Sequence, residues 1–418
     1  MVALLFMEYE LTLTTLTYGG DAMGRLDDPI TGTGGRAVFV PFGLPGERIH
    51  VRLTSEKKNF ARGEIVEILE ASKDRIQPKC IHFGECGGCH YQTLSYENQL
   101  AAKTEILIDQ LKRIGKIENP PVQAMIGCPN PWNYRNHIQF SLNHDGRLSF
   151  QMSNSNQVIP ITECHLPEPS INSLWPQLTF DPGTDIARVS LRAGNKDDLM
   201  LVLESDSPET PELEIEAGIS VTHLYEENTV VIAGNDHIIL RVLERDFKIS
   251  AASFFQVNTA MAEKMVNHLL TSLPVSMSTT LLDVYCGVGL FSAFFSPKCG
   301  QVIGIESSES ACEDFVVNLD EFDNVELYEG LAEEVIPHLE LKPDIVLVDP
   351  PRAGLDKQVV DGILKLNPQT IAYVSCDPST LARDAARLIN GGYKLKEVTP
   401  FDLFPQTYHI ESISLFEK

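Results

Sequence analysis

The first 72 residues alternate between apolar and polar positions in short runs, with glycine and proline between the runs. Alternation with a period of two is typical of half-buried strands, and the glycines and prolines predict tight turns. Strands this short predict a small β-barrel of the oligonucleotide-binding type. The expected strands are Glu8–Leu16, Ala37–Pro41, Glu47–Leu53 and Gly63–Leu69.

Residues 73–250 carry a second pattern. Apolar residues at helical spacing predict one long helix over residues 94–114, which could pack on the domain that follows. The rest of this block predicts a strand-rich central domain. The expected strands are Tyr134–Leu142, Arg147–Met152, Ile186–Arg192, Leu199–Leu203, Thr229–Ile232 and His237–Val242.

Residues 251–418 alternate short apolar runs with helical patterns, which predicts a Rossmann-like α/β domain. Repeated strand–helix units form a parallel sheet, and two closing strands without a helix between them predict an antiparallel edge. Ligands bind at the carboxyl ends of such strands. The expected strands are Thr280–Tyr285, Gln301–Ile305, Val325–Tyr328, Ile345–Val348, Thr370–Ser375, Leu395–Phe401 and His409–Phe416, with helices at Ser308–Leu319 and Pro378–Leu388.

Composition narrows the class of protein. The chain has 418 residues and a formal net charge of −25, with acidic residues concentrated in Glu204–Glu216 and Glu306–Glu340. This charge counts against a generic nucleic-acid binder, but the stretch Arg52–Arg135 is nearly balanced and could face RNA through Lys57, Lys58 and Arg62. No apolar run is long enough to cross a membrane, and the N-terminus lacks a signal peptide's basic region, so we expect a cytoplasmic protein.

The first strand of the third block ends in a glycine turn that predicts a nucleoside site. Gly287 and Gly289 follow Asp283, and the next strand ends in Glu306, whose carboxylate can accept hydrogen bonds from ribose hydroxyls. A dinucleotide site would need a third glycine where Ser292 stands. The pattern therefore favours a cofactor without phosphates, such as S-adenosylmethionine.

The fourth and fifth strands end in residues suited to chemistry. Asp349 opens the sequence Asp-Pro-Pro-Arg, and Cys376 lies between the fifth strand and a helix that Asp377 can cap. A helix N-terminus lowers the pKa of a thiol, so we expect Cys376 to be a reactive thiolate. Taken alone, Glu411 in the closing hairpin is better explained as a surface or structural acid than as a base.

Three cysteines crowd into ten residues, Cys80, Cys86 and Cys89, and Cys164 is a candidate fourth ligand. Four thiolates can bind zinc or an iron–sulfur cluster, and their spacing leaves both open.

These motifs together resemble the RNA uracil-5-methyltransferases over nearly the whole chain. The first block is similar to the TRAM domain, an RNA-binding barrel. The matching segments are the Gly24-Arg25 pair, Phe39–Pro41, Leu44–Glu47, the cysteine cluster, Phe255–Asn258, Asp283–Gly289, Asp349–Gly354, Ser375–Asp384 and His409–Ser412. One departure is Leu290, where some relatives carry asparagine.

The resemblance implies a role for each site residue. Cys376 would be the nucleophile that adds to C6 of uracil, and Glu411 the base that removes the C5 proton. Four residues would hold S-adenosylmethionine: Gln256, Tyr285, Glu306 and Asp349. The four cysteines Cys80, Cys86, Cys89 and Cys164 would bind a 4Fe-4S cluster.

The resemblance also implies three domains, residues 1–72, 73–250 and 251–418, and a structured RNA substrate. A barrel combined with a cluster favours 23S ribosomal RNA over transfer RNA, where the alternative target is uridine 54. An RNA cytosine-C5 methyltransferase, or a non-catalytic RNA-binding protein with a metal-stabilised domain, fits these motifs less well. We expect a monomer with no membrane partner.

Overall fold

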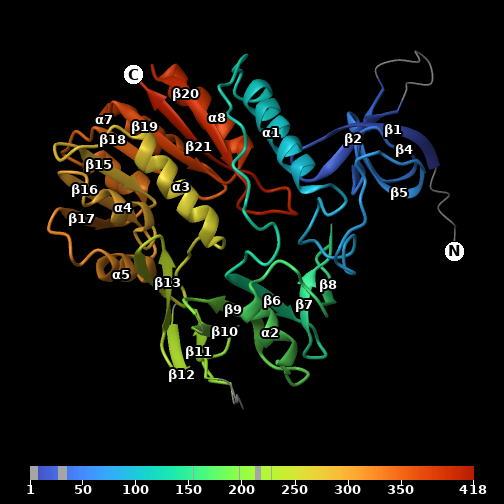
Figure 1. The fold of residues 1–418 in the computed structure, drawn as a ribbon, viewed down its shortest axis with the longest axis horizontal. Helices are drawn as coiled ribbons and strands as arrows, with labels where there is room; N and C mark the ends of the chain where they lie inside the picture. The colour runs from blue at the N-terminus through green and yellow to red at the C-terminus, as the bar shows by residue number, and fades with distance from the viewer. Residues whose placement is uncertain (1–7, 27–34, 154, 197, 212–217, 227) are drawn as a thin grey trace. The chain divides into compact units, whose positions relative to one another are not determined.

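The structure is a computed structural model that describes residues 8–26, 35–153, 155–196, 198–211, 218–226 and 228–418. The apolar start of the chain and part of the acidic stretch Glu204–Glu216 lie outside these residues. The chain divides into two compact units (Figure 1). The first comprises the chain up to Ile106, Gln151–Gln157 and Phe404–His409, and the second comprises Leu107–Phe150, Val158–Leu403 and Ile410–Lys418.

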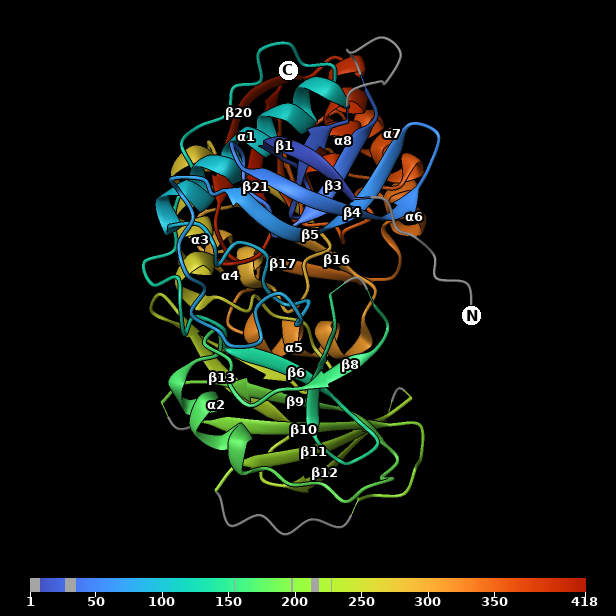
Figure 2. The ribbon, with the colours of Figure 1, turned by 90° about the vertical axis from the view of Figure 1, so that its right-hand side faces the viewer.

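The first unit contains the predicted barrel, which is closed and has β2 as a fifth strand besides the four expected ones (Figure 2). Around it the strands follow the order β1-β2-β3-β5-β4, and the β3–β5 pair is parallel. Alternate side chains, among them Leu13, Val40 and Val51, fill the interior with almost no exposure to solvent. The strands are β1 (Glu8–Leu16), β2 (Asp21–Arg25), β3 (Ala37–Pro41), β4 (Arg48–Glu56) and β5 (Phe60–Glu70).

A buried ion pair ties the barrel to the segment that leaves it. The Glu47 side chain has no exposed surface, and its carboxylate accepts hydrogen bonds from Arg75 Nε at 2.5 Å and from the Leu44 backbone N–H at 2.9 Å. Burial opposes ionisation of Glu47, but the hydrogen bonds from Arg75 and Leu44 outweigh it and lower the pKa of this carboxyl. Removing one partner of such a pair typically costs about 3–5 kcal/mol.

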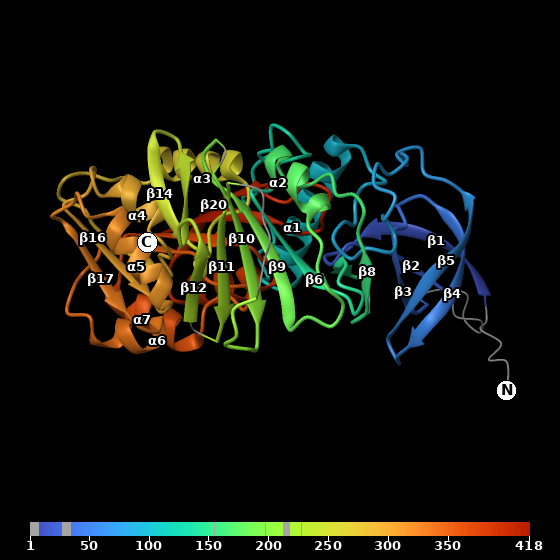
Figure 3. The same ribbon diagram turned by 90° about the horizontal axis from the view of Figure 1, so that it is seen from below.

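The second unit contains a seven-stranded, mostly antiparallel sheet, which confirms the strand-rich central region (Figure 3). Its order is β12-β11-β10-β9-β6-β7-β8, and only the β10–β11 pair is parallel among those described. Its strands are β6 (His137–Leu142), β7 (Leu148–Gln151), β8 (Val158–Pro160), β9 (Ile186–Ala193), β10 (Leu199–Ser205), β11 (Ser220–Tyr225) and β12 (Asn228–Ala233). A separate hairpin, β13 (His237–Val242) with β14 (Arg245–Ser250), leads into the next sheet.

The other sheet of the second unit is the predicted α/β fold. Its order is β17-β16-β15-β18-β19-β21-β20; the five strands from β15 to β19 run parallel, and β21 is antiparallel to both neighbours. The strands are β15 (Thr280–Val284), β16 (Gln301–Glu306), β17 (Val325–Glu329), β18 (Ile345–Val348), β19 (Thr370–Ser375), β20 (Lys394–Phe401) and β21 (Glu411–Glu417). Strands β15, β18 and β19 are buried along almost their whole length, which fits a sheet covered on both faces.

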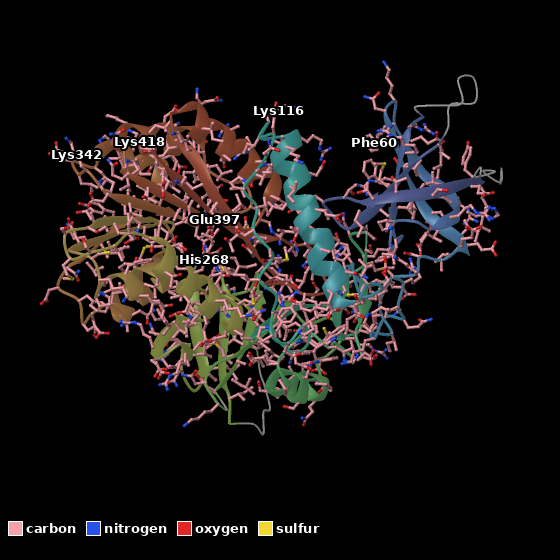
Figure 4. The ribbon with its side chains drawn as sticks, turned by 45° about the horizontal axis from the view of Figure 1, so that its top comes forward. Phe60, Lys116, His268, Lys342, Glu397 and Lys418 are labelled. Atoms are coloured by element: carbon pink, nitrogen blue, oxygen red, sulfur yellow. The ribbon has the colours of Figure 1, made fainter. Side chains whose placement is uncertain are left out.

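Helices complete both units. The predicted long helix is α1 (Tyr96–Arg113), and the boundary between the units falls inside it. The others are α2 (Pro169–Leu174), α3 (Thr259–Ser272), α4 (Leu290–Phe295), α5 (Glu309–Asn318), α6 (Ala332–Val335), α7 (Lys357–Leu366) and α8 (Pro378–Asn390), with 3₁₀ turns at Trp175–Gln177 and Ile336–His338. His268 of α3 faces Glu397 of β20, with 3.5 Å between Nε2 and Oε1, so α3 is tied to the antiparallel edge (Figure 4). Within the described residues, no helix is both long and apolar enough to span a bilayer.

Candidate active site

The order of the parallel strands brings the proposed site residues to one edge of the sheet. Asp283 pairs in register with Gly304 of β16 and Leu347 of β18. Tyr285, Glu306 and Asp349 therefore stand at neighbouring strand ends, and Cys376 follows the end of β19 next to them. The edge is the one at which sheets of this class bind ligands.

A strained turn follows β15. Tyr285 has a φ of 64°, and Gly287 and Gly289 have φ of 54° and 88°. A methyl group on Gly289 would lie 2.4 Å from a Leu319 side-chain carbon, so a larger residue would be both strained and crowded. The turn thus keeps the backbone open beside the neighbouring strand end.

The Glu306 carboxylate binds the backbone amide groups of this edge through hydrogen bonds. It accepts hydrogen bonds from the backbone N–H groups of Gly287 at 2.9 Å, Ser307 at 2.7 Å and Ser308 at 2.8 Å. A pyrophosphate would need such amides for itself and would meet a negative charge here. The structure therefore supports the prediction of a nucleoside site without phosphates.

Two more carboxyl groups of this edge have pKa values well above those of ordinary aspartates. Asp283 has no exposed surface; one of its oxygens accepts from Ser292 Oγ at 2.6 Å, while the other, Oδ1, has no partner within the described residues. Burial raises the pKa of Asp283 to about 7, and burial with the charge of Asp283 raises that of Asp349 to about 7. An unpaired buried acceptor among three carboxyl groups fits a ligand that carries hydroxyl donors and positive charge, as S-adenosylmethionine does.

Gln256 lies in a loop that is fixed from both sides. The Asn136 side-chain amide donates to the Gln256 carbonyl and to Thr259 Oγ1, both at 3.0 Å. Asn258 caps α3 and donates to the Leu403 carbonyl at 2.9 Å. Asn136 was not singled out from the sequence, because it lies 120 residues from its partner and its role is visible only in the fold.

Cys376 and Glu411 stand side by side. Ser375 pairs with Ser412 across β19 and β21, so the two residues that flank this pair share one edge. Glu411 is buried, with 6% of its surface exposed, and Cys376 is half-buried. Burial, followed by the charges of Glu411 and Asp349, raises the pKa of Cys376 to about 12.

The expected depressed pKa of Cys376 is therefore wrong for the protein without ligands. The helix N-terminus does not act on the thiol alone, because the Asp377 carboxylate accepts the N–H groups of Ser379 at 2.8 Å and Thr380 at 3.0 Å. The nearby Arg352 lowers the pKa of Cys376, but the carboxylates and burial outweigh it.

A clamp that was not assigned from the sequence positions Arg352. Asp384 is fully buried and accepts from the Leu355 backbone N–H at 2.8 Å and from Tyr373 Oη at 3.0 Å. Arg383 binds the same carboxylate and donates to the Ala353 carbonyl at 2.9 Å. The loop after β18 is thereby fastened to α8, next to Cys376.

Side chains suited to RNA contact, the aromatic ones next to Gln256 and the cations of the barrel, differ in how exposed they are. Phe254, beside Gln256, is 71% exposed, whereas Phe255 packs against Phe247 with ring centroids 5.9 Å apart. Lys57 and Lys58 are exposed in the turn between β4 and β5. Arg62 instead forms an ion pair with Asp21 at 2.9 Å.

The predicted cluster ligands are divided between the units. Cys80, Cys86 and Cys89 belong to the first unit and Cys164 to the second, and all four are partly exposed. The Gly88 N–H points at Cys86 Sγ at 3.4 Å, and burial, with a contribution from Cys80, raises the pKa of Cys86. Within the described ranges, no three potential ligands converge on a point that could hold a single metal ion.

Comparison with known proteins bears on this site. A family model described as tRNA (Uracil-5-)-methyltransferase matches residues 226–418, and a TRAM domain model matches residues 4–66. An uncharacterized RNA methyltransferase of Caldanaerobacter subterraneus subsp. tengcongensis is 35% identical to this chain, with 98% of each chain covered. Another, from Thermosynechococcus vestitus, is 32% identical, with 97% of each covered.

A solved structure shares the fold. The tRNA (uracil-54, C5)-methyltransferase of Pyrococcus abyssi, in complex with S-adenosyl-L-homocysteine, superposes with a TM-score of 0.74 at 24% identity. The match covers 98% of this chain and 100% of that one. The predicted arrangement of barrel, strand-rich region and α/β domain is confirmed by this likeness.

Burial and the charges around Cys376 predict that its thiol is alkylated slowly. At pH 8 the ligand-free protein should alkylate Cys376 with iodoacetamide far more slowly than an ordinary thiol does, and the rate should still be rising above pH 9. Glu411→Gln removes the largest opposing charge and should raise the rate several-fold, since one pKa unit is a tenfold change in thiolate. Peptide mass spectrometry reads the rate at Cys376. Glu397→Gln, which also alters the antiparallel edge, is the control and should leave the rate unchanged.

Proposed function

The chain belongs to the RNA uracil-5-methyltransferase family, TRAM-containing enzymes that use S-adenosylmethionine to form 5-methyluridine in RNA, and we propose that Cys376 is its nucleophile and Glu411 its base. The observation that supports this assignment is the adjacency of a thiol and a buried carboxylate at the carboxyl edge of the sheet. Three further carboxyl groups, Asp283, Glu306 and Asp349, stand at the neighbouring strand ends.

The two residues have complementary tasks. C5 of uracil is too weak a nucleophile to accept a methyl group unaided. The Cys376 thiolate bonds to C6 and pushes the electron pair of the C5–C6 double bond onto C5. After C5 is methylated, Glu411 takes the C5 proton, the double bond re-forms, and the C6–sulfur bond breaks to return the thiolate.

Burial and the charges of Glu411 and Asp349 oppose ionisation of the Cys376 thiol, so positive charge beside the sulfur favours its attack. Arg352, held by the Asp384 clamp, supplies one charge. S-adenosylmethionine, when bound, supplies a second in its sulfonium, together with the electrophilic methyl group. We assign its binding to Gln256, Tyr285, Glu306 and Asp349, of which Glu306 is suited to the ribose hydroxyls.

We further propose that Cys80, Cys86, Cys89 and Cys164 bind a 4Fe-4S cluster. The proposal comes from the family resemblance and is supported by the three partly exposed thiols in one short loop. A cluster offers each cysteine a separate iron, so its ligands need not converge on one point as those of zinc do. The cluster would have a structural role, in a protein that we still expect to be a cytoplasmic monomer.

The RNA substrate that we propose is 23S ribosomal RNA. Support comes from the combination of a TRAM barrel with the proposed cluster, and Lys57 and Lys58 on the barrel are placed to contact phosphates. Uridine 54 of transfer RNA is the second candidate, because the Pyrococcus abyssi protein with the same fold is described as a tRNA (uracil-54, C5)-methyltransferase. The division into domains at residues 72 and 250 stays a prediction.

Substituting the two catalytic residues should stop the reaction at different points. Cys376→Ala should abolish methyl transfer and form no adduct. Glu411→Gln keeps the shape of the side chain but cannot take the C5 proton, so labelled methyl and RNA should accumulate on the protein as a band that resists denaturing gel electrophoresis. Turnover should fall at least about 10²-fold. Glu397→Gln is the control. Methylation by Cys376→Ala would refute the nucleophile.

The cluster proposal predicts about four iron atoms per chain in anaerobically purified protein, with brown colour. Any single Cys→Ser change among the four ligands should lower the iron content, while Cys299→Ser, at a buried cysteine of the α/β domain, should not. Stoichiometric zinc in place of iron would overturn the proposal.

Mapping 5-methyluridine in the RNA of a strain that lacks the protein tests which RNA is the substrate. We expect one or more sites in 23S RNA to lose the methyl group, and expression of the wild type but not of Cys376→Ala to restore it. Loss at position 54 of transfer RNA alone would favour the second candidate.

A further inference from the structure

A cavity lies in the second unit, beside the N-terminus of α3. Its volume is about 330 Å³, at the lower end of ligand-binding pockets and large enough for one nucleobase. Three separate segments line it: residues 128–134 before β6, Glu168 before α2, and residues 258–263 of α3. None of these residues has a role in the reaction described above.

Besides the Asn130 amide, whose oxygen accepts the Trp132 backbone N–H at 3.2 Å, the cavity presents hydrogen-bond acceptors. Asn133 uses its amide nitrogen to donate to the Pro167 carbonyl at 2.9 Å, which leaves its oxygen for a ligand. Glu263 uses Oε1 to accept the Leu243 backbone N–H at 2.8 Å, so that Oε2 is left for a ligand. A ligand that pairs with Asn133 and Glu263 must therefore bring donors.

Glu168 is the acceptor that most needs a partner. It occupies the N-cap position of α2, yet its side chain makes no capping hydrogen bond. Burial raises the pKa of Glu168, with no offsetting cation or donor in the part of the chain that is described. A half-buried carboxylate of this kind gains free energy when a ligand supplies the missing N–H groups.

The remaining walls suit a flat ring. Tyr134, 6% exposed, contributes an aromatic side chain, and Ala260 and Pro129 contribute apolar surface. Cys128 contributes an uncharged side chain, because burial raises the pKa of its thiol. The thiol donates to the Asn130 carbonyl at 3.0 Å. Unstacked bases of RNA are recognised by stacking on aromatic side chains and by hydrogen bonds to their edges.

The cavity is also connected to the catalytic centre. Thr259 lines it and accepts a hydrogen bond from Asn136, whose same amide group holds the Gln256 carbonyl. Asn258, another lining residue, caps α3 and donates to the Leu403 carbonyl. A base seated here would therefore lie close to the loop that we assign to S-adenosylmethionine.

We propose that this cavity binds an unstacked guanine of the RNA substrate, whose N1–H and 2-amino group donate together to the Glu168 carboxylate. Guanine alone among the four bases presents two adjacent donors on its Watson–Crick edge. Adenine and cytosine would turn a ring nitrogen acceptor towards the carboxylate, and uracil offers one N–H between two carbonyls. The nearby acids repel phosphate, so the base enters and the backbone stays outside. The inference rests on the RNA methyltransferase activity and names a second nucleotide that the enzyme reads.

The test has one arm that does not need methyl transfer. Saturation-transfer NMR, with S-adenosylhomocysteine present to fill the cofactor site, should detect guanosine on the wild type and much less on Glu168→Gln. Inosine, which lacks the 2-amino group, and adenosine should bind more weakly than guanosine. Glu326→Gln, on the far strand β17, is the matched control and should bind guanosine as the wild type does.

The second arm measures methylation of RNA from the strain that lacks the protein. Glu168→Gln should raise the KM for RNA about 5- to 100-fold, the range expected for losing one bidentate base contact, and leave the KM for S-adenosylmethionine and the alkylation of Cys376 unchanged. Equal binding of guanosine and adenosine, or an unchanged KM for RNA, would overturn the guanine pocket. Stronger competition by methylguanidine than by guanosine would assign the cavity to an arginine of a protein partner instead. Failure of the proposed nucleophile would show separately, as activity in Cys376→Ala.

Discussion

Carboxyl groups crowded at the ends of parallel strands set the chemistry of this protein. The order of β16, β15, β18 and β19 places Glu306, Asp283, Asp349 and Cys376 next to one another, and β21 adds Glu411. Burial, together with the charges of neighbouring carboxylates, raises the pKa values of Asp283 and Asp349 to about 7 and that of Cys376 to about 12. A cation bound at this edge would offset these charges, so the site is complementary to a cationic ligand.

Two hydrogen-bonded supports hold this arrangement in place. The Arg383–Asp384 clamp fastens the loop after β18 to α8, and Gly354 is needed within it because a methyl group there would lie 2.5 Å from Asp384 Oδ2. On the other side, Asn136 fixes the loop of Gln256. Both supports join segments that are far apart in sequence, so each loop of the site is fastened to a second element.

The sequence was enough to predict the barrel, the parallel sheet and the strand ends, because alternation and strand–helix periodicity report directly on burial. Strands β2, β8, β11 and β14 were missed. With three residues, β8 is too short to show an alternating pattern. The thiol's pKa was predicted in the wrong direction because the helix was considered without its cap, Asp377, and without the carboxylates of other strands. The cavity at Glu168 could not be predicted, because its walls come from three distant segments.

The hydrogen bonds between Glu306 and the backbone amides affect which adenine nucleotides the site accepts. Adenine nucleotides share the adenosine half of S-adenosylmethionine and compete for any site that recognises only that half. By filling the amides that a polyphosphate would seek and adding a negative charge, Glu306 makes the site unfavourable for ATP. A site of this kind favours the methyl donor over the adenine nucleotides that share its adenosine.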